Sequence, residues 1–137
     1  MTAGRRRTGA AWDGLAQARR EAADRGDRRV GTQHLLLALL ARPEGDAQRV
    51  LRQAGASRAR CETVLDALHG SGAPRSRRDA DEVGAGDRAS AVLDHAARTG
   101  EGVVTDEALL AALLADPHLG LAAAVFRYLG IGPRPIH

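Results

Sequence analysis

An apolar phrase occurs twice in the sequence, and this repeat limits what the chain can fold into. The segment V-G-T-Q-H-L-L-L-A-L-L at 30–40 returns as V-V-T-D-E-A-L-L-A-A-L-L at 103–114. Thr32 corresponds to Thr105, an offset of 73 residues, or about half of the chain. Self-similarity at a fixed offset indicates two tandem copies of one structural unit.

A second, shorter echo follows each copy and supports the same division. V-L-R-Q-A-G-A at 50–56 matches V-F-R-Y-L-G-I at 125–131. The apolar residues are mainly Ala, Leu and Val, with one Phe, one Tyr and one Trp, and Ala and Leu favour helices. No alternation of apolar and polar residues is long enough to indicate a half-buried strand. The sequence therefore predicts an all-α fold, a pseudo-twofold pair of small helical bundles.

Apolar spacing and end residues predict the individual helices. They are expected at 10–25, 33–41, 47–54, 58–68, 87–98, 106–114 and 119–129. Thr32, Asp46, Ser57 and Thr105 stand where N-cap residues belong, and Gly26, Gly55 and Gly130 stand where helices end. The helix after Thr32 is apolar on all sides, which predicts that it is central and buried.

Composition divides the chain into five parts. The predicted units are a flexible basic arm at 1–9, a first repeat at 10–69, a Gly-rich linker at 70–86, a shortened second repeat at 87–131 and a tail at 132–137. The linker is polar and Gly-rich, so we expect it to bury almost nothing.

Charge and cysteine content bound the environment and the partners. The 20 basic residues are all Arg, but 17 acidic residues are interleaved with them, which is typical of a solvated surface. Arg5-Arg6-Arg7 and the cluster at 75–78 leave a small basic nucleic-acid binder as the alternative reading. No apolar stretch reaches the length of a membrane span, no secretory signal is present, and the single Cys61 fits a reducing cytosol. We therefore expect a cytoplasmic protein that does not bind a membrane.

The repeat resembles a known family, the Clp N-terminal or Clp repeat domain. The residues that carry the resemblance are Glu21-Ala22, Gly26, Val30 to Leu40, Gly45, Ala47, Val50-Leu51 and Gly55. The similarity covers roughly residues 8–131, and it is weaker in the second repeat, where Glu107 and Ala108 replace the usual His-Leu.

The resemblance implies a role in recognition. The family's domain sits in front of ATPase modules of protein-unfolding chaperones and receives substrates and adaptors for an attached protease. The present sequence has no G-x-x-x-x-G-K-[ST] loop and no Lys. It therefore predicts a standalone, non-enzymatic binding module without a cofactor, acting as adaptor, competitor or decoy. The implied partners are Clp ATPase or protease components, adaptor or client proteins and cyclic peptide ligands.

The resemblance also implies two anion sites. Family members bind phosphorylated arginine through a Thr of the first helix and the acid of G-T-E-H, and helix starts favour anions while carboxylates pair with guanidinium groups. The matching positions are Thr8 and Gln33 in the first repeat, and Gly86 or Asp87 with Asp106 in the second. Gln33 is neutral and Asp87 repels phosphate. The alternative is that Thr32 and Thr105 are helix caps and nothing more.

The family binds adaptors and cyclic peptides in a groove between the first helices of the two halves. Here the segments Trp12–Arg19 and Arg88–His95 would line it, with Trp12, Arg19 and Arg88 as the partner surface. Trp12 is either a core residue or an exposed anchor. His34 is expected to be a packed, hydrogen-bonded side chain and Cys61 a buried, inert thiol. The His residues show no metal-ligand spacing, so no metal site is predicted.

Overall fold

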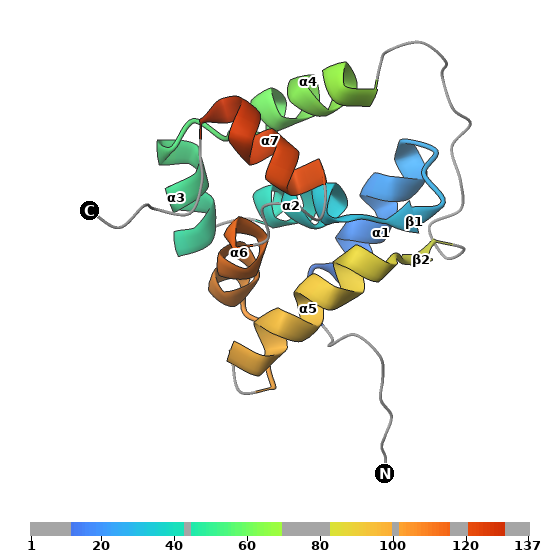
Figure 1. The fold of residues 1–137 in the computed structure, drawn as a ribbon, viewed down its shortest axis with the longest axis vertical. Helices are drawn as coiled ribbons and strands as arrows, with labels where there is room; N and C mark the ends of the chain where they lie inside the picture. Colours follow the sequence, from blue (N-terminus) through green and yellow to red (C-terminus); the bar gives the residue numbers. More distant parts are fainter. Residues whose placement is uncertain (1–11, 43–44, 70–82, 100–101, 116–120, 131–137) are drawn as a thin grey trace.

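The computed structural model describes residues 12–42, 45–69, 83–99, 102–115 and 121–130. These residues form seven helices and one pair of two-residue strands (Figure 1). In chain order the elements are α1 (Leu15–Asp24), β1 (Arg29–Val30), α2 (Thr32–Ala41), α3 (Asp46–Gln53), α4 (Arg58–His69), β2 (Gly84–Ala85), α5 (Asp87–Thr99), α6 (Asp106–Leu114) and α7 (Leu121–Leu129). The predicted all-α fold is confirmed.

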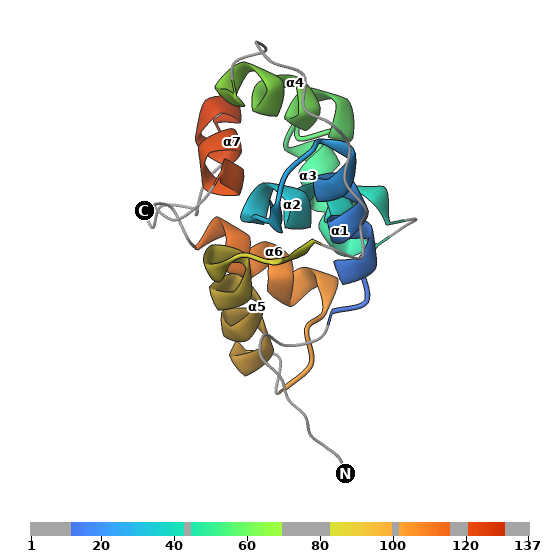
Figure 2. The ribbon, with the colours of Figure 1, turned by 90° about the vertical axis from the view of Figure 1, so that its right-hand side faces the viewer.

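The helices repeat in space as the sequence repeats along the chain. α1 packs against α2 in the first half as α5 packs against α6 in the second. The following helices cross over, because α3 contacts α6 as well as α2, and α7 contacts α2 as well as α6. α2 lies at the centre with α6 beside it in both views (Figures 1 and 2). The two repeats thus share one core.

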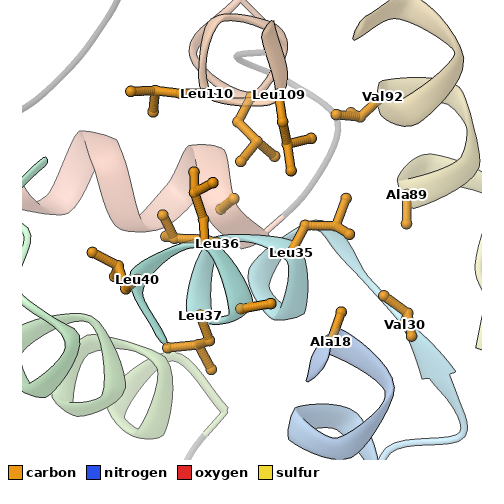
Figure 3. Close-up of a cluster of buried hydrophobic side chains, with 14 of the residues drawn as sticks. Ala18, Val30, Leu35, Leu36, Leu37, Leu40, Ala89, Val92, Leu109 and Leu110 are labelled. Atoms are coloured by element: carbon orange, nitrogen blue, oxygen red, sulfur yellow. The ribbon is translucent and has the colours of Figure 1, made fainter. Parts of the chain in front are cut away.

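The core is built around α2, as its all-round apolar pattern predicts. Every residue from Thr32 to Leu40 is buried. Leu36 points toward Leu109 of α6, and Leu37 points to the opposite side of α2 (Figure 3). Such a helix has no solvent face, so its place in the centre follows from its composition.

A short parallel strand pair joins the two halves, and the sequence did not predict it. Arg29 pairs with Gly84 and Val30 with Ala85, and the Gly86 N–H donates a 2.8 Å hydrogen bond to the Val30 carbonyl. Val83 is buried at 2% exposure, so this residue of the predicted linker belongs to the core, although the linker was expected to bury almost nothing. The pairing depends on residues far apart in the sequence and is too short to produce an alternating pattern.

The first helix begins at Leu15, so the prediction that it already includes Trp12 to Gly14 is wrong. The Trp12 indole folds back over Gly14, and a Cβ on Gly14 would collide with the ring. The chain therefore turns here before the helix starts. The predicted residues Ala10 and Ala11 lie outside the described part of the chain, as does the predicted start of the last helix at Leu119.

Two of the predicted caps are confirmed and two are wrong. Thr105 Oγ1 accepts a 3.0 Å hydrogen bond from the Ala108 N–H, and Ser57 Oγ accepts one of 3.2 Å from the Arg60 N–H. Asp46 lies inside the first turn of α3, which Gly45 precedes, and its carboxylate bonds Arg49 instead.

Thr32 was predicted to cap α2, but its side chain caps α7. Its Oγ1 accepts a 3.1 Å hydrogen bond from the Ala122 N–H in the first turn of α7. His34 replaces it on α2, because its Nδ1 accepts a 2.8 Å hydrogen bond from the Gly31 N–H. This is the reciprocal half of a capping box.

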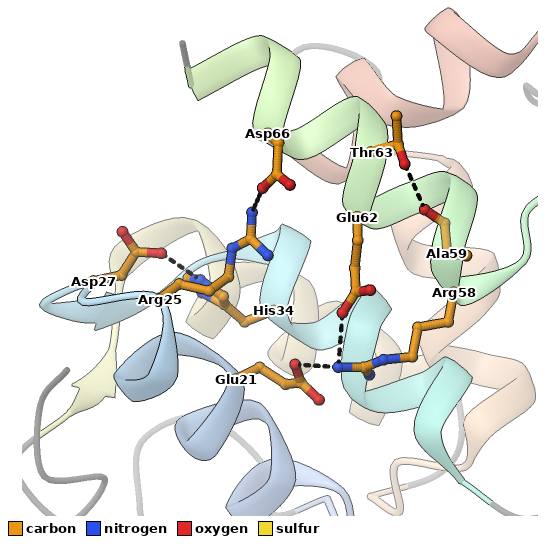
Figure 4. A network of polar contacts seen from close by, with 9 residues as sticks. All are labelled: Glu21, Arg25, Asp27, His34, Arg58, Ala59, Glu62, Thr63 and Asp66. Atoms are coloured by element: carbon orange, nitrogen blue, oxygen red, sulfur yellow. Dashed lines mark hydrogen bonds and ion pairs between the residues drawn. The ribbon is translucent and has the colours of Figure 1, made fainter. Parts of the chain in front are cut away.

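A polar cluster joins α4 to α1 and α2, the other helices of the first repeat that it contacts through side chains (Figure 4). The Arg58 guanidinium bonds Glu21 of α1 at 2.7 Å, Glu62 at 3.0 Å and the Leu37 carbonyl at 3.2 Å. Glu21 is buried, and its hydrogen bond is the main cause that raises the pKa of Arg58. Arg25 at the end of α1 also bonds Asp66 of α4.

Because both repeats share the core, a cavity at their contact should destabilise the whole domain. We expect Leu36→Ala to lower the free energy of unfolding by about 2–5 kcal/mol, measured by urea denaturation. Leu68→Ala is the control, since Leu68 is 43% exposed and should change it by less than about 0.5 kcal/mol. Two separate transitions in the wild type would contradict a shared core.

Candidate functional site

Asp106 is the centre of a cluster formed by both repeats. It lies at the start of α6, where the helix dipole favours a carboxylate. Its Oδ1 accepts a 3.0 Å hydrogen bond from Trp12 Nε1. Its Oδ2 accepts from Arg42 Nε at 2.7 Å and from Gln48 Nε2 at 3.1 Å. Both carboxylate oxygens are therefore occupied by donors of the same chain.

The residues around Asp106 also contact one another. The Arg42 guanidinium carbon lies 5.5 Å from the centre of the Trp12 ring, within cation–π range. Gln48 is fully buried, and its Nε2 also donates to the Leu39 carbonyl at 2.8 Å. Among the described residues, its buried Oε1 has no hydrogen-bond partner. Asp106 therefore binds a guanidinium beside an aromatic ring, and that guanidinium is Arg42.

Trp12 is a core residue in this structure. It is 5% exposed, and its single N–H is used by Asp106. Of the two alternatives that the sequence left open, the buried one describes its position. A buried indole with a satisfied N–H holds the start of α1 against the second repeat.

The structure brings the start of α2 close to the start of α5. β1 leads through Gly31 into α2, and β2 leads through Gly86 into α5, so the parallel pairing aligns the two helix starts. Gln33 is 8% exposed, and its amide folds over Gly31. Gly86, which precedes α5, therefore lies beside the start of α2 and is bonded to Val30, whereas Asp106 is bonded to Trp12, Arg42 and Gln48.

The other predicted site residues are accounted for individually. Asp87 is exposed in the first turn of α5, and Thr8 lies outside the described residues. Arg19 and Arg88 are both exposed, and no hydrogen bond or ion pair among the described residues engages the side chain of either. They remain the predicted partner surface.

Sequence reasoning missed Arg42 and Gln48. Arg42 directly follows α2 and lies outside the predicted helices, and Gln48 is one of several polar residues on α3. Their common target, Asp106, is 64 and 58 residues away. No local pattern encodes such contacts.

His34 is packed and hydrogen-bonded, as predicted. Its Nδ1 accepts from the Gly31 N–H, so the ring proton lies on Nε2, which is 2.8 Å from Asp27 Oδ2. The side chain is 1% exposed. Figure 4 shows the His34 ring facing the Asp27 carboxylate. The pair connects the start of α2 to the segment before β1.

An open hollow of about 310 Å³ lies between α4 and α7. Its lining is mainly apolar, with one guanidinium, and comprises Ala59, Arg60, Thr63, Val64, Tyr128 and Leu129. Among the described residues, no three His, Cys, Asp or Glu side chains gather as metal ligands. No helix in the described ranges is long and apolar enough to cross a membrane.

The fold and the cross-repeat contacts define a double-repeat, all-helical domain. A family model described as the Clp repeat (R) N-terminal domain matches residues 6–127, most of the chain. The chain belongs to this family, whose domain is a protein-interaction module. No curated protein matches the sequence.

The Asp106 cluster should be a measurable stabiliser. Asp106→Ala leaves the Trp12 N–H and Arg42 without the carboxylate that accepts from them, so we expect a loss of about 1–3 kcal/mol of unfolding free energy. Fluorescence of the single Trp12 should shift to the red as the ring becomes solvated. Asp46→Ala is the matched control, because its Arg49 pair is exposed and should contribute less than about 1 kcal/mol. Equal losses in the two variants would contradict the central role of Asp106.

Cys61 should be inert in the folded protein. Burial raises the pKa of its thiol to about 11, so the nucleophilic thiolate is scarce at pH 8. We expect labelling by a thiol-reactive disulfide to be at least tenfold faster in urea than in buffer.

The raised pKa of Cys61 also makes the stability of the folded protein depend on pH. The unfolded thiol loses its proton at lower pH than the folded one, so Cys61 should reduce stability as pH rises from 9 to about 11. Unfolding curves of the wild type and Cys61→Ala over this range check the effect. Parallel pH dependences in the two proteins would be evidence against a raised folded-state pKa.

Proposed function

We propose that this chain is a protein-binding module that modulates a Clp chaperone–protease by contacting the machine or its adaptors. The observation that carries the proposal is the family match over residues 6–127. The same sequence offers no phosphate-binding loop and no Lys for nucleotide chemistry. Its contribution would therefore be recognition through surface complementarity.

Gln33 and Asp106 stand at the two acid positions, and they favour binding to the Clp machine or an adaptor over binding to client proteins marked with phosphoarginine. Gln33 is neutral, so it offers no charge to a guanidinium. Asp106 carries the charge, but Arg42 already binds it at 2.7 Å. A phosphoarginine ligand would have to displace that ion pair and the contact of Arg42 with Trp12. We propose a competitor or adaptor role that does not depend on phosphoarginine.

The arginine arrangement disfavours the nucleic-acid alternative. Arg25, Arg42, Arg49 and Arg58 each form an ion pair with an acidic side chain. Guanidinium groups neutralised within the protein release fewer counterions from a phosphate backbone. Among the described residues, other exposed arginines, such as Arg28 and Arg88, directly follow an acidic residue.

Affinity capture from the lysate of the native host, read by mass spectrometry, tests the proposal. The tagged wild type should enrich a Clp ATPase or its peptidase, and free phosphoarginine should not release it. Arg19→Glu/Arg88→Glu should reduce the enrichment at least tenfold if these exposed cations form the partner surface. Arg28→Glu/Arg60→Glu makes the same charge change elsewhere on exposed positions and should leave it intact.

Each other outcome has a defined meaning. Capture of diverse clients that phosphoarginine elutes would contradict the proposal and assign the chain to client binding. Loss of capture in both double variants would show that net charge, not the Arg19 and Arg88 surface, drives binding.

A further inference from the structure

The open hollow between α4 and α7 is bounded by one face of α4 and by the end of α7. Its volume of about 310 Å³ stands at the lower end of the range for ligand pockets, roughly 300–1,000 Å³. The hollow therefore has room for one or two side chains of another molecule. The α4 wall consists of Ala59, Arg60, Thr63 and Val64, and the α7 wall consists of Tyr128 and Leu129.

The rim of the hollow exposes apolar surface. The Tyr128 side chain carries an aromatic ring and is 68% exposed. Leu68, four residues after Val64 on the same face of α4, is 43% exposed. Tyr and Arg are the residue types that, with Trp, contribute most to binding at protein interfaces. Tyr128 and Arg60 both line this hollow.

Arg60 is the charged residue in the lining of the hollow. The two acids of α4, Glu62 and Asp66, point toward α1 and are each paired with an arginine, whereas Thr63 points away from α1 (Figure 4). The sequence of α7 contains no acidic residue. Among the described residues, no ion pair engages the Arg60 guanidinium, so its charge is available to a ligand.

The polar groups that the hollow offers to a ligand are mainly donors. The Thr63 hydroxyl donates its proton to the Ala59 carbonyl at 3.0 Å. The Arg60 guanidinium has N–H donors and no acceptor, and the Tyr128 hydroxyl can donate as well. A negatively charged acceptor is therefore the polar group that complements this site.

We propose that the hollow between α4 and α7 binds a short segment of a partner protein in which a Leu or Phe side chain stands next to a carboxylate. The apolar side chain would pack against Val64 and Leu129. The carboxylate would pair with the Arg60 guanidinium, which can present two parallel N–H groups to it. The Tyr128 ring would pack on the same segment and shield the ion pair from water.

The shape of the hollow and the composition of the chain indicate a separate protein as the occupant. Pockets for small ligands enclose most of the ligand surface, which an open hollow does not do. Two segments of the chain itself lack the required chemistry. Residues 70–82, which follow α4, contain no Val, Leu, Ile, Met or aromatic residue, and residues 131–137, which follow α7, contain no acidic side chain.

The hollow is distinct from the surface of Arg19 and Arg88. α4 lies at the opposite end of the molecule from α5, which carries Arg88, in both views (Figures 1 and 2). We expect the two surfaces to bind different partners, so a change of Arg60 should leave capture of the Clp machine intact. The inference does not depend on that machine, and failure of the capture experiment would leave binding at the hollow unchanged.

A matched pair of peptides tests the proposal on the full chain. Acetyl-G-L-F-D-G-amide carries the apolar and acidic side chains, and the second peptide has Lys in place of Asp. Titrated into the ¹⁵N-labelled protein, the Asp peptide should cause saturable amide shifts at residues 59–64 and 128–129. It should bind at least about threefold more tightly than the Lys peptide, because Arg60 attracts one charge and repels the other.

Three variants separate the contributions of charge and apolar contact. Arg60→Glu should reverse the order of the two peptides. Arg52→Glu is the matched control, because Arg52 is exposed in the last turn of α3 and does not line the hollow, so the order should stay. Tyr128→Ala should weaken both peptides alike, since it removes apolar contact without changing the charge.

Each contrary result has a defined meaning. The changed side chains are exposed, so circular dichroism should show the same fold in all three variants. Absence of saturable shifts on α4 and α7 would overturn the proposal. Reversal of the peptide order in Arg52→Glu as well would show that net charge alone sets the preference, and would also overturn it.

Two further outcomes would assign the hollow to another occupant. Concentration-dependent self-association that Arg60→Glu abolishes, measured by light scattering, would assign it to a second copy of the chain. Peptide binding that appears only after deletion of residues 131–137 would assign it to that segment. Either result overturns the proposed partner.

Discussion

The structure depends on the burial of two leucine-rich helices that neither repeat can cover alone. α2 has no polar face, and its covering helices include α7 of the other repeat. α6 is in turn packed against α3 of the first. Removing four or five leucine side chains from water on each helix is a stronger driving force than any polar contact described here. Each repeat exchanges a covering helix with the other, because α7 packs on α2 and α3 packs on α6. The two short repeats therefore form one cooperative domain.

The polar contacts between the repeats follow from this exchange. Once α7 lies against α2, the Thr32 hydroxyl is placed to accept the Ala122 N–H, which a helix start would otherwise leave unpaired. Once α6 lies beside α3, Asp106 comes within reach of Gln48, Arg42 and Trp12. These bonds select one arrangement of helices whose apolar packing is already favourable, since a misplaced Asp106 would leave a charge partly buried and unpaired.

Sequence reasoning was reliable where the determining contacts are local. The Leu-rich pattern after Thr32 and Thr105 gave the central helices, and Gly26 and Gly55, both with positive φ, end the helices that they were expected to end. It failed where a side chain serves a distant partner. Thr32 looks like an N-cap of its own helix, but its hydroxyl is taken by α7, 90 residues away. The β1–β2 pair and the Asp106 cluster were missed for the same reason.

The repeat also explains why the candidate sites are unequal. Duplication alone would give two matching surfaces, but each surface here has been altered by a different residue. The first acid position holds Gln33, which is neutral. The second holds Asp106, whose carboxylate already forms an ion pair with Arg42. An internal guanidinium that is both ion-paired and stacked on Trp12 has a high effective concentration, so a free ligand of similar chemistry competes poorly with it. The recognition capacity of the domain is therefore expected on its exposed helix faces, which include Arg19 of α1 and Arg88 of α5.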